Sequence, residues 1–341
     1  LSLILSAVAV SAMAQWQPVG ENIMTPWADE VDPSAVHQEY PRPQMVRGQW
    51  MNLNGLWDYA ITPCGSVDFV AEGKILVPFA VESALSGVGR RVDEDKELWY
   101  ERTFSIPSSW KAKDILLHFG AVDWKTDVWV NGYYVGEHKG GYDPFSFNIT
   151  PYIRSNGRQT LRVKVYDATD QAFQPRGKQV KVPGLIWYTP VTGIWQTVWM
   201  EPVDKSHIKD YYVVSDLDAG TMTVTVDVAA LRVDDVVKVE VMEGGQGYSA
   251  ENPSSELISA AECVNGKAIL NIPEVRPWSP DSPYLYGIKV TLLRGSKVVD
   301  SVDGYTAMRS ISVVKDKTRN KYRRMARNGD IFFQFGPLDQ G

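Results

Sequence analysis

The chain has 341 residues, of which 44% are hydrophobic, and it contains 12 Trp, 16 Tyr and 10 Phe. A single hydrophobic core usually stops growing at ~250 to 300 residues, so this length indicates two domains, and the apolar content is ample for two cores. The formal net charge of −6 argues against a nucleic-acid-binding surface, for which a basic patch is expected.

The first 14 residues are almost entirely apolar and end in Ala12-Met13-Ala14, a sequence of the kind that signal peptidase cleaves. Neither a Met nor a basic segment precedes this run. We therefore expect part of a signal peptide at residues 1–14, and export to the periplasm or the exterior. The run is shorter than the ~20 residues that a membrane-spanning helix needs, so we expect no membrane span.

Cys64 and Cys263 are the two cysteines of the chain. Export would permit a disulfide between them. They lie far apart in the sequence and in separate predicted domains, which favours two free thiols. With no nearby His, we also expect no zinc site at these cysteines.

Alternating apolar residues mark the strands of a first domain, which we place at residues 15–203. Leu161, Val163 and Val165 alternate with polar side chains. This period of two places the apolar side chains on one face of a strand, where they can pack in a core. Several such runs, separated by Gly, Pro and Asn, predict an antiparallel β-sandwich. The Pro-rich residues 16–50 predict an extended strap over this domain.

The stretch from Phe119 to Tyr152 carries the strongest local signals. Asn131 and Gly132 stand between two β-prone runs, which predicts a hairpin with a type I′ turn. The second strand runs into the loop 140–144 (GGYDP), which combines flexible backbone with a ring and a carboxylate. Ligands are commonly bound by loops of this kind. The candidate substrate-binding residues in and beside this stretch are Trp124, His138, Tyr142 and Asp143.

Residues 171–190 form a loop that is too long for an ordinary hairpin turn. It carries basic residues together with Trp187 and Tyr188, which we add to the substrate-binding candidates. The loop could equally contact another part of the protein. Residues 87–97 are dense in charges of both signs and are typical of a solvated loop.

A second domain follows at residues 204–314. Met222, Val224, Val226 and Val228 alternate with polar residues, and about seven such strands in ~105 residues predict an immunoglobulin-like β-sandwich. The fold class is therefore all-β. The basic residues between 315 and 327 could suggest an acidic partner, but an exposed connector over 315–341 is the favoured interpretation.

Several motifs resemble segments of glycoside hydrolase family 2, which contains β-galactosidases, β-glucuronidases and β-mannosidases. The chain is similar to this family from about residue 40 to its end. The motifs occur in the family's order at residues 120–124 (GAVDW), 128–132 (VWVNG), 136–145 (GEHKGGYDPF), 192–201 (TGIWQTVWME) and 278–286 (WSPDSPYLY).

The resemblance implies a jelly-roll connectivity for the first domain and retaining, β-galactosidase-like hydrolysis of β-glycosides in carbohydrate breakdown. Two glutamates of a (β/α)8 barrel perform that reaction. A barrel takes ~250 residues, and few remain after Asn328, so the resemblance assigns no catalytic residue here and implies a chain that is inactive alone. It implies no cofactor and no metal ligand in this chain, allows a cation near the active site of the full-length enzyme, and leaves a homodimer open. The expected partners are a β-linked oligosaccharide or glycoside and the missing barrel.

Asp143 matches an acidic residue that projects toward the active site in related β-galactosidases, where it can bond sugar hydroxyls. The alternative is that its carboxylate caps the turn before Pro144, as Asp does readily.

A second hypothesis is a stand-alone carbohydrate-binding or adhesion module that uses the candidate rings Trp124, Tyr142, Trp187 and Tyr188. The apolar run 332–335 (FFQF) argues against it, because such a strand would have no sheet to join at a natural end. Neither hypothesis specifies which sugar is bound.

Overall fold

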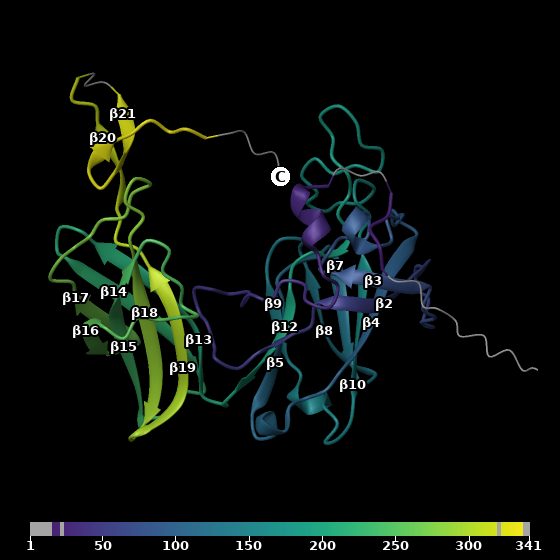
Figure 1. Ribbon diagram of the computed structural model, residues 1–341, viewed down its shortest axis with the longest axis horizontal. Coiled ribbons are helices and arrows are strands. Elements are labelled where there is room, and N and C mark those ends of the chain that lie inside the picture. Colours follow the sequence, from purple (N-terminus) through teal and green to yellow (C-terminus); the bar gives the residue numbers. More distant parts are fainter. Residues whose placement is uncertain (1–15, 21–23, 319–321, 337–341) are drawn as a thin grey trace, which may run out of the picture.

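The computed structural model describes residues 16–20, 24–318 and 322–336. Within these ranges the chain is built of β-strands and short 3-10 helices, and the strands form two sandwiches joined by residues 204–206 (Figure 1). The prediction of an all-β chain with two sandwiches in succession is confirmed. The predicted signal peptide at 1–14 lies outside the described residues.

The first sandwich packs a six-stranded sheet on a four-stranded sheet, and all of its strand pairs are antiparallel. The larger sheet has the order β3 (Gly73–Val77), β2 (Gly55–Pro63), β4 (Lys96–Phe104), β10 (Gln159–Tyr166), β7 (Lys125–Val130), β8 (Tyr133–Lys139). The smaller has the order β1 (Met51–Asn52), β12 (Val198–Val203), β5 (Asp114–Phe119), β9 (Phe145–Asn148), and β6 (Val122–Asp123) pairs separately with β11 (Gly193–Ile194). The core between the sheets includes the fully buried Trp57, Tyr100 and Phe119.

The predicted hairpin is formed by β7 and β8. Asn131 and Gly132 have φ values of 54° and 86°, the two positive angles that a type I′ turn requires. The Asn131 side chain also donates to the Tyr152 carbonyl at 2.8 Å and accepts from the Thr160 N–H at 3.0 Å. The turn is thereby tied to the neighbouring strand β10.

The second sandwich has seven strands, in agreement with the predicted number. One sheet has the order β13 (His207–Asp216), β14 (Thr221–Ala229), β17 (Lys267–Asn271), and the other β16 (Leu257–Glu262), β15 (Asp235–Gly245), β18 (Leu285–Arg294), β19 (Lys297–Thr306). A small sheet of β20 (Ile311–Lys315), β21 (Arg323–Arg327) and β22 (Asp330–Ile331) follows. Cys64 and Cys263 lie in different sandwiches and are unpaired, as predicted.

The 3-10 helices are η1 (Pro26–Glu30), η2 (Ala84–Ser86), η3 (Ser108–Trp110) and η4 (Thr150–Tyr152). The first of them belongs to the Pro-rich strap, which contacts more than the first domain. Val46 forms an antiparallel bridge with Asp303 of β19, and the Arg47 guanidinium forms an ion pair with Asp300 of the same strand. The strap therefore joins the two sandwiches.

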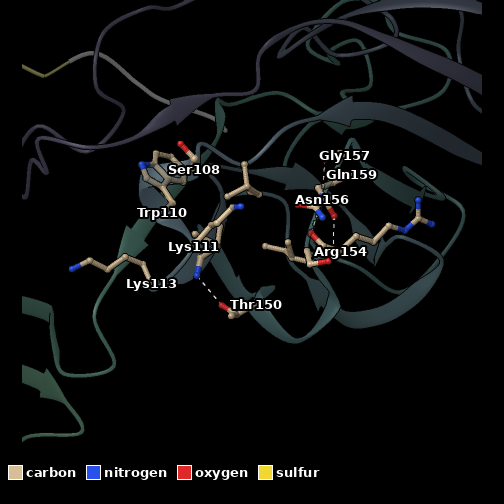
Figure 2. Close-up of a pocket in the computed structure, with 13 residues that line it drawn as sticks. Ser108, Trp110, Lys111, Lys113, Thr150, Arg154, Asn156, Gly157 and Gln159 are labelled. Carbon is tan, nitrogen blue, oxygen red and sulfur yellow. Dashed lines mark hydrogen bonds between the residues drawn. The ribbon is translucent and has the colours of Figure 1, made fainter.

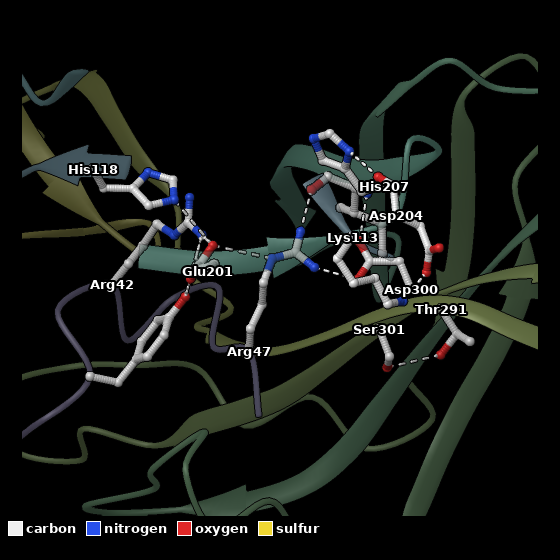
Figure 3. Close-up of polar contacts among 12 residues, drawn as sticks. Arg42, Arg47, Lys113, His118, Glu201, Asp204, His207, Thr291, Asp300 and Ser301 are labelled. Atoms are coloured by element: carbon white, nitrogen blue, oxygen red, sulfur yellow. Dashed lines mark hydrogen bonds and ion pairs between the residues drawn. The ribbon is translucent and has the colours of Figure 1, made fainter. Parts of the chain in front are cut away.

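Glu201 of β12 is the centre of this junction (Figure 3). Its side chain is fully buried and accepts a hydrogen bond from the Tyr40 hydroxyl. Arg42 lies 3.0 Å from its carboxylate and Arg47 lies 3.4 Å away, both from the strap. His118 Nε2 of β5 approaches the same carboxylate at 3.3 Å. His118 is thus part of this buried network.

Candidate functional site

The loop 140–144 leaves β8 at the end of the sandwich opposite the Asn131-Gly132 turn. The Gly140 N–H donates to the Trp124 carbonyl at 3.2 Å, and the Gly141 carbonyl accepts from the Trp195 indole N–H at 2.7 Å. A Cβ on Gly141 would lie 2.6 Å from the Asp123 carboxylate oxygen, so a side chain has no room there. The loop is therefore held closely against the sandwich.

Tyr142 projects from this loop over a pocket of about 510 Å³ that the strap also lines. The Tyr142 side chain is 54% exposed, and its ring meets the Trp195 ring edge to face at a centroid distance of 6.0 Å. Tyr40 and Arg42 line the strap side, and Trp199 lines the sheet side. Aromatic rings beside charged groups are a suitable surface for a sugar, whose rings have apolar faces and polar edges.

His138 and Asp143 lie close together at the base of the same loop. A Cβ on Gly140 would lie 3.6 Å from His138 Nε2 and 3.9 Å from Asp143 Oδ2. The His138 ring stacks on Phe145 at a centroid distance of 4.1 Å, and burial lowers the pKa of His138, although the nearby Asp143 carboxylate acts in the opposite direction. His138 is therefore a neutral ring at pH 7.

The Asp143 side chain is exposed. No hydrogen bond or ion pair joins its carboxylate to another described residue, so the alternative of a turn cap has no support in this geometry. The carboxylate is free to accept hydrogen bonds from sugar hydroxyls.

The other three candidate rings lie apart from Tyr142. Trp124 is half-buried behind the loop and meets it through its carbonyl. Trp187 and Tyr188 are 42% and 48% exposed in the long loop, where the Arg176 guanidinium lies 5.7 Å from the Trp187 ring centroid. Within the described ranges, no hydrogen bond or ring contact joins either residue to Tyr142 or Asp143.

The long loop is nevertheless connected to the base of the site. Gln179 donates to the Asp123 carboxylate at 3.5 Å and accepts from the Val191 N–H at 2.7 Å. Burial raises the pKa of Asp123 to about 7, and the nearby Asp167 carboxylate adds to the shift. Asp123, Gln179 and Trp195 are not among the site residues predicted from the sequence. Asp123 and Trp195 do belong to recognised motifs, which is the one signal that pointed to them.

The base of the long loop contains two more buried carboxyl groups. The Thr192 N–H donates to Glu82 at 2.9 Å, and its hydroxyl donates to Asp167 at 2.8 Å. Burial raises the pKa of Glu82 to about 8, although the Thr192 hydrogen bonds lower it in part. These contacts attach the end of the long loop to the first sandwich.

The segment 87–97 packs against the outer part of the long loop. Lys181 forms an ion pair with Glu94 and lies 3.6 Å from Asp93, and Arg91 donates to the Lys181 carbonyl. The mixed charges of this segment therefore have partners in another loop, in addition to their contact with solvent.

In the described part of the chain, no group of three or more His, Cys, Asp or Glu side chains is suited to a metal ion. None of the helices found there is long and apolar enough to cross a membrane.

Two family models match the chain in succession. Residues 84–200 match the sugar binding domain of glycosyl hydrolases family 2, and residues 206–309 match a second model described as glycosyl hydrolases family 2. The chain belongs to glycoside hydrolase family 2.

Characterised relatives agree with this family. The chain is 28% identical over 222 residues to a β-galactosidase of Thermoanaerobacter pseudethanolicus, covering 64% of the chain and 29% of the relative. It is 22% identical over 239 residues to a β-glucuronidase of Formosa agariphila, covering 64% of the chain and 24% of that relative. An apo β-glucuronidase structure from Ruminococcus gnavus shares the fold with a TM-score of 0.68 and 21% identity. The match covers 88% of the present chain and 50% of the β-glucuronidase chain. The chain thus spans less than a third of these two curated relatives and about half of the solved structure.

Proposed function

We propose that the chain is the front part of an exported family 2 glycoside hydrolase that cleaves β-glycosidic bonds with retention of configuration, as a β-galactosidase does. The observation that carries this proposal is the pair of family models, which occur in order on two adjoining sandwiches. The substrate is a β-linked oligosaccharide or glycoside.

Retaining hydrolysis needs two carboxyl groups ~5 Å apart on either side of the glycosidic bond. We assign both to a (β/α)8 barrel that follows this chain in the whole protein. The chain alone then has no hydrolytic activity, and the whole enzyme could assemble as a homodimer.

Within that enzyme, the loop 140–144 contributes to substrate binding beside the barrel. Two features support this role: the exposed Asp143 carboxylate forms no hydrogen bond or ion pair with a described residue, and the Tyr142 ring packs edge to face against Trp195 while remaining half exposed. Asp143 accepts hydrogen bonds from sugar hydroxyls, and Tyr142 covers an apolar sugar face.

Replacing Asp143 by Ala in the full-length enzyme tests this role. We expect kcat/KM on nitrophenyl β-galactoside or β-glucuronide to fall by about 10- to 100-fold, because one or two hydrogen bonds to a charged group are lost. Asp218→Ala is the matched control, since Asp218 is also an exposed aspartate but lies in the turn between β13 and β14 of the second sandwich. Equal kinetics for wild type and Asp143→Ala would exclude the role of this loop.

The proposed location of the two catalytic carboxyl groups in a barrel has its own test. The purified 341-residue chain should hydrolyse neither substrate, while the full-length protein hydrolyses at least one of them. Hydrolysis by the chain alone at the full-length rate would contradict the proposed barrel site.

A further inference from the structure

The outer face of the six-stranded sheet is turned away from the second sandwich. The strap meets the first sandwich at Glu201 of the four-stranded sheet and reaches Asp300 of the second sandwich, so the six-stranded sheet lies on the side away from the second sandwich (Figure 1). On β10, Leu161 and Val163 are buried in the core, and the alternate residues Arg162 and Lys164 are partly exposed. This outer face is therefore open to a ligand.

A groove of about 720 Å³ crosses this face. Its volume lies within the range of ~300 to 1,000 Å³ that is usual for ligand sites. Residues 65–67 form one wall, and the floor and rim include Trp99, Glu101, Trp129, Arg154, Arg162 and Lys164.

Two tryptophans form the floor. The Trp99 and Trp129 rings stack at a centroid distance of 5.5 Å, and Lys164 Nζ lies 5.7 and 5.9 Å from their centroids. Trp129 is half-buried, so part of its ring remains available. Trp99 is 5% exposed, and its buried indole N–H has no hydrogen-bond partner among the described residues. The exposed part of Trp129, which lies among charged groups, suits the apolar face of a pyranose ring.

The charges at the groove are paired, with one exception. Arg162 donates to Glu101 at 3.0 Å, and Lys164 lies 3.1 Å from Glu97 and 3.4 Å from Asp127. Such fixed pairs present both donors and acceptors to sugar hydroxyls.

Arg154 is the exception. Its side chain is exposed, and no described carboxylate lies within 4.0 Å of it. Figure 2 shows that this side chain also borders a neighbouring pocket, where it runs away from Trp110 and Lys111. Its backbone is held on both sides by Gln159, which accepts from the Arg154 N–H at 2.9 Å and donates to its carbonyl at 3.2 Å. An unpaired guanidinium at the rim of a groove matches the planar carboxylate of a uronic acid.

We propose that this groove binds an acidic glycan as a site separate from the hydrolytic centre. One sugar ring lies on Trp129, its hydroxyls bond the Glu101–Arg162 pair, and the carboxylate of a neighbouring uronic acid bonds Arg154. The groove lies toward the Asn131-Gly132 turn, and the length of β8, roughly 20 Å at 3.3 Å per residue, separates that turn from the loop 140–144. The site therefore serves to hold the enzyme on a polysaccharide and goes beyond the proposed hydrolysis.

Affinity electrophoresis of the full-length protein tests this site. The gels contain polygalacturonate, alginate or chondroitin, and a neutral hydroxyethyl cellulose gel is the reference. We expect retardation in at least one uronate gel, at least tenfold weaker binding for Trp129→Ala, and about tenfold weaker binding for Arg154→Gln. Retardation in none of the three uronate gels would overturn the proposal.

Arg158→Gln is the matched control, because Arg158 is an exposed arginine of the same segment that does not line the groove. It should bind like wild type, and a loss equal to that of Arg154→Gln would indicate non-specific charge attraction instead. Hydrolysis of a nitrophenyl glycoside should be unchanged in Trp129→Ala and Arg154→Gln, which separates this site from the loop 140–144. If either substitution instead converted a dimer to a monomer in analytical ultracentrifugation, the face would be a contact between two copies and the proposal would fail.

Discussion

Glu201 is a fully buried carboxylate that has two arginines, a tyrosine hydroxyl and an imidazole around it. Burial alone would raise its pKa, but His118, Arg42 and Arg47 outweigh burial and lower the pKa of Glu201 to about 2. His118 Nδ1 lies 2.6 Å from the Ser146 hydroxyl, and burial lowers the pKa of His118. The ring is therefore neutral, with Nδ1 beside the Ser146 hydroxyl and Nε2 3.3 Å from the Glu201 carboxylate.

Replacing Glu201 by Gln should destabilise the first sandwich by about 3 to 5 kcal/mol, because removing one partner of a buried ion pair leaves the other charges uncompensated. Urea unfolding measures this change. Glu39→Gln is the control, since Glu39 is exposed and paired only with the exposed His37. Equal stability of Glu201→Gln and wild type would mean that the network contributes nothing net.

Glu82 gives the stability a dependence on pH. Its folded pKa of about 8 lies above the ordinary value of 4.5, so between these values the folded state binds more protons than the unfolded state. Stability must therefore fall as pH rises through this interval. Asp123 acts in the same direction up to about pH 7. The buried neutral His118 acts in the opposite direction only below its ordinary pKa of 6.5.

The clearest window is therefore pH 6.5 to 8, over which we expect a loss of ~1 to 2 kcal/mol of unfolding free energy. Thermal unfolding at several pH values measures it. Glu82→Gln should flatten the dependence while keeping an acceptor for the Thr192 N–H. The same slope in Glu82→Gln and wild type would show that another group is responsible.

At the scale of the element, the stability of the β7–β8 hairpin depends on its turn. Gly132 has a φ of +86°, and no neighbouring atom lies within 4 Å of the position that a Cβ would take. A substitution there therefore meets backbone strain without a clash. Gly132→Ala should cost about 1 kcal/mol or somewhat more in urea unfolding, because L residues disfavour this conformation.

Gly48→Ala is the matched control for that change. Gly48 also has open space around its Cβ position, but its φ is not in the left-handed region. It should leave stability unchanged or raise it by up to ~1 kcal/mol, because Ala restricts the unfolded chain. A similar loss for both variants would contradict the assignment of the strain to the turn.

At the scale of the whole molecule, Arg47 joins the two sandwiches. Its side chain is 6% exposed and contacts Glu201 of the first sandwich, Asp300 of the second and the Ile208 carbonyl at 2.6 Å. The strap that carries it precedes both sandwiches in the sequence. The relative position of the sandwiches therefore depends on a segment outside both of them.

Arg47→Met should separate the unfolding of the two sandwiches, so that calorimetry resolves two transitions or a broader one. Arg42→Met is the control, because Arg42 pairs with Glu201 but does not reach the second sandwich. It should lower the stability of the first sandwich without separating the transitions. A single unchanged transition in Arg47→Met would mean that other contacts join the sandwiches.

Local patterns in the sequence predict the strands, their buried faces and the Asn131-Gly132 turn. Side chains alternate across a strand with a period of two, and a type I′ turn needs two residues that tolerate positive φ. The same patterns place Tyr142 and Asp143 in one loop and His138 at the end of the strand that leads into it. Neighbours along the backbone suffice for all of these predictions.

The partners of individual side chains come from the tertiary structure alone. Arg47 meets Glu201 and Asp300, Trp195 supports Tyr142, and Gln179 reaches Asp123. These contacts join residues tens to hundreds of positions apart, and no repeat along the chain encodes them. They depend on how the sheets pack and where the strap crosses. For that reason the sequence predicts neither the junction at Glu201 nor the groove on the six-stranded sheet.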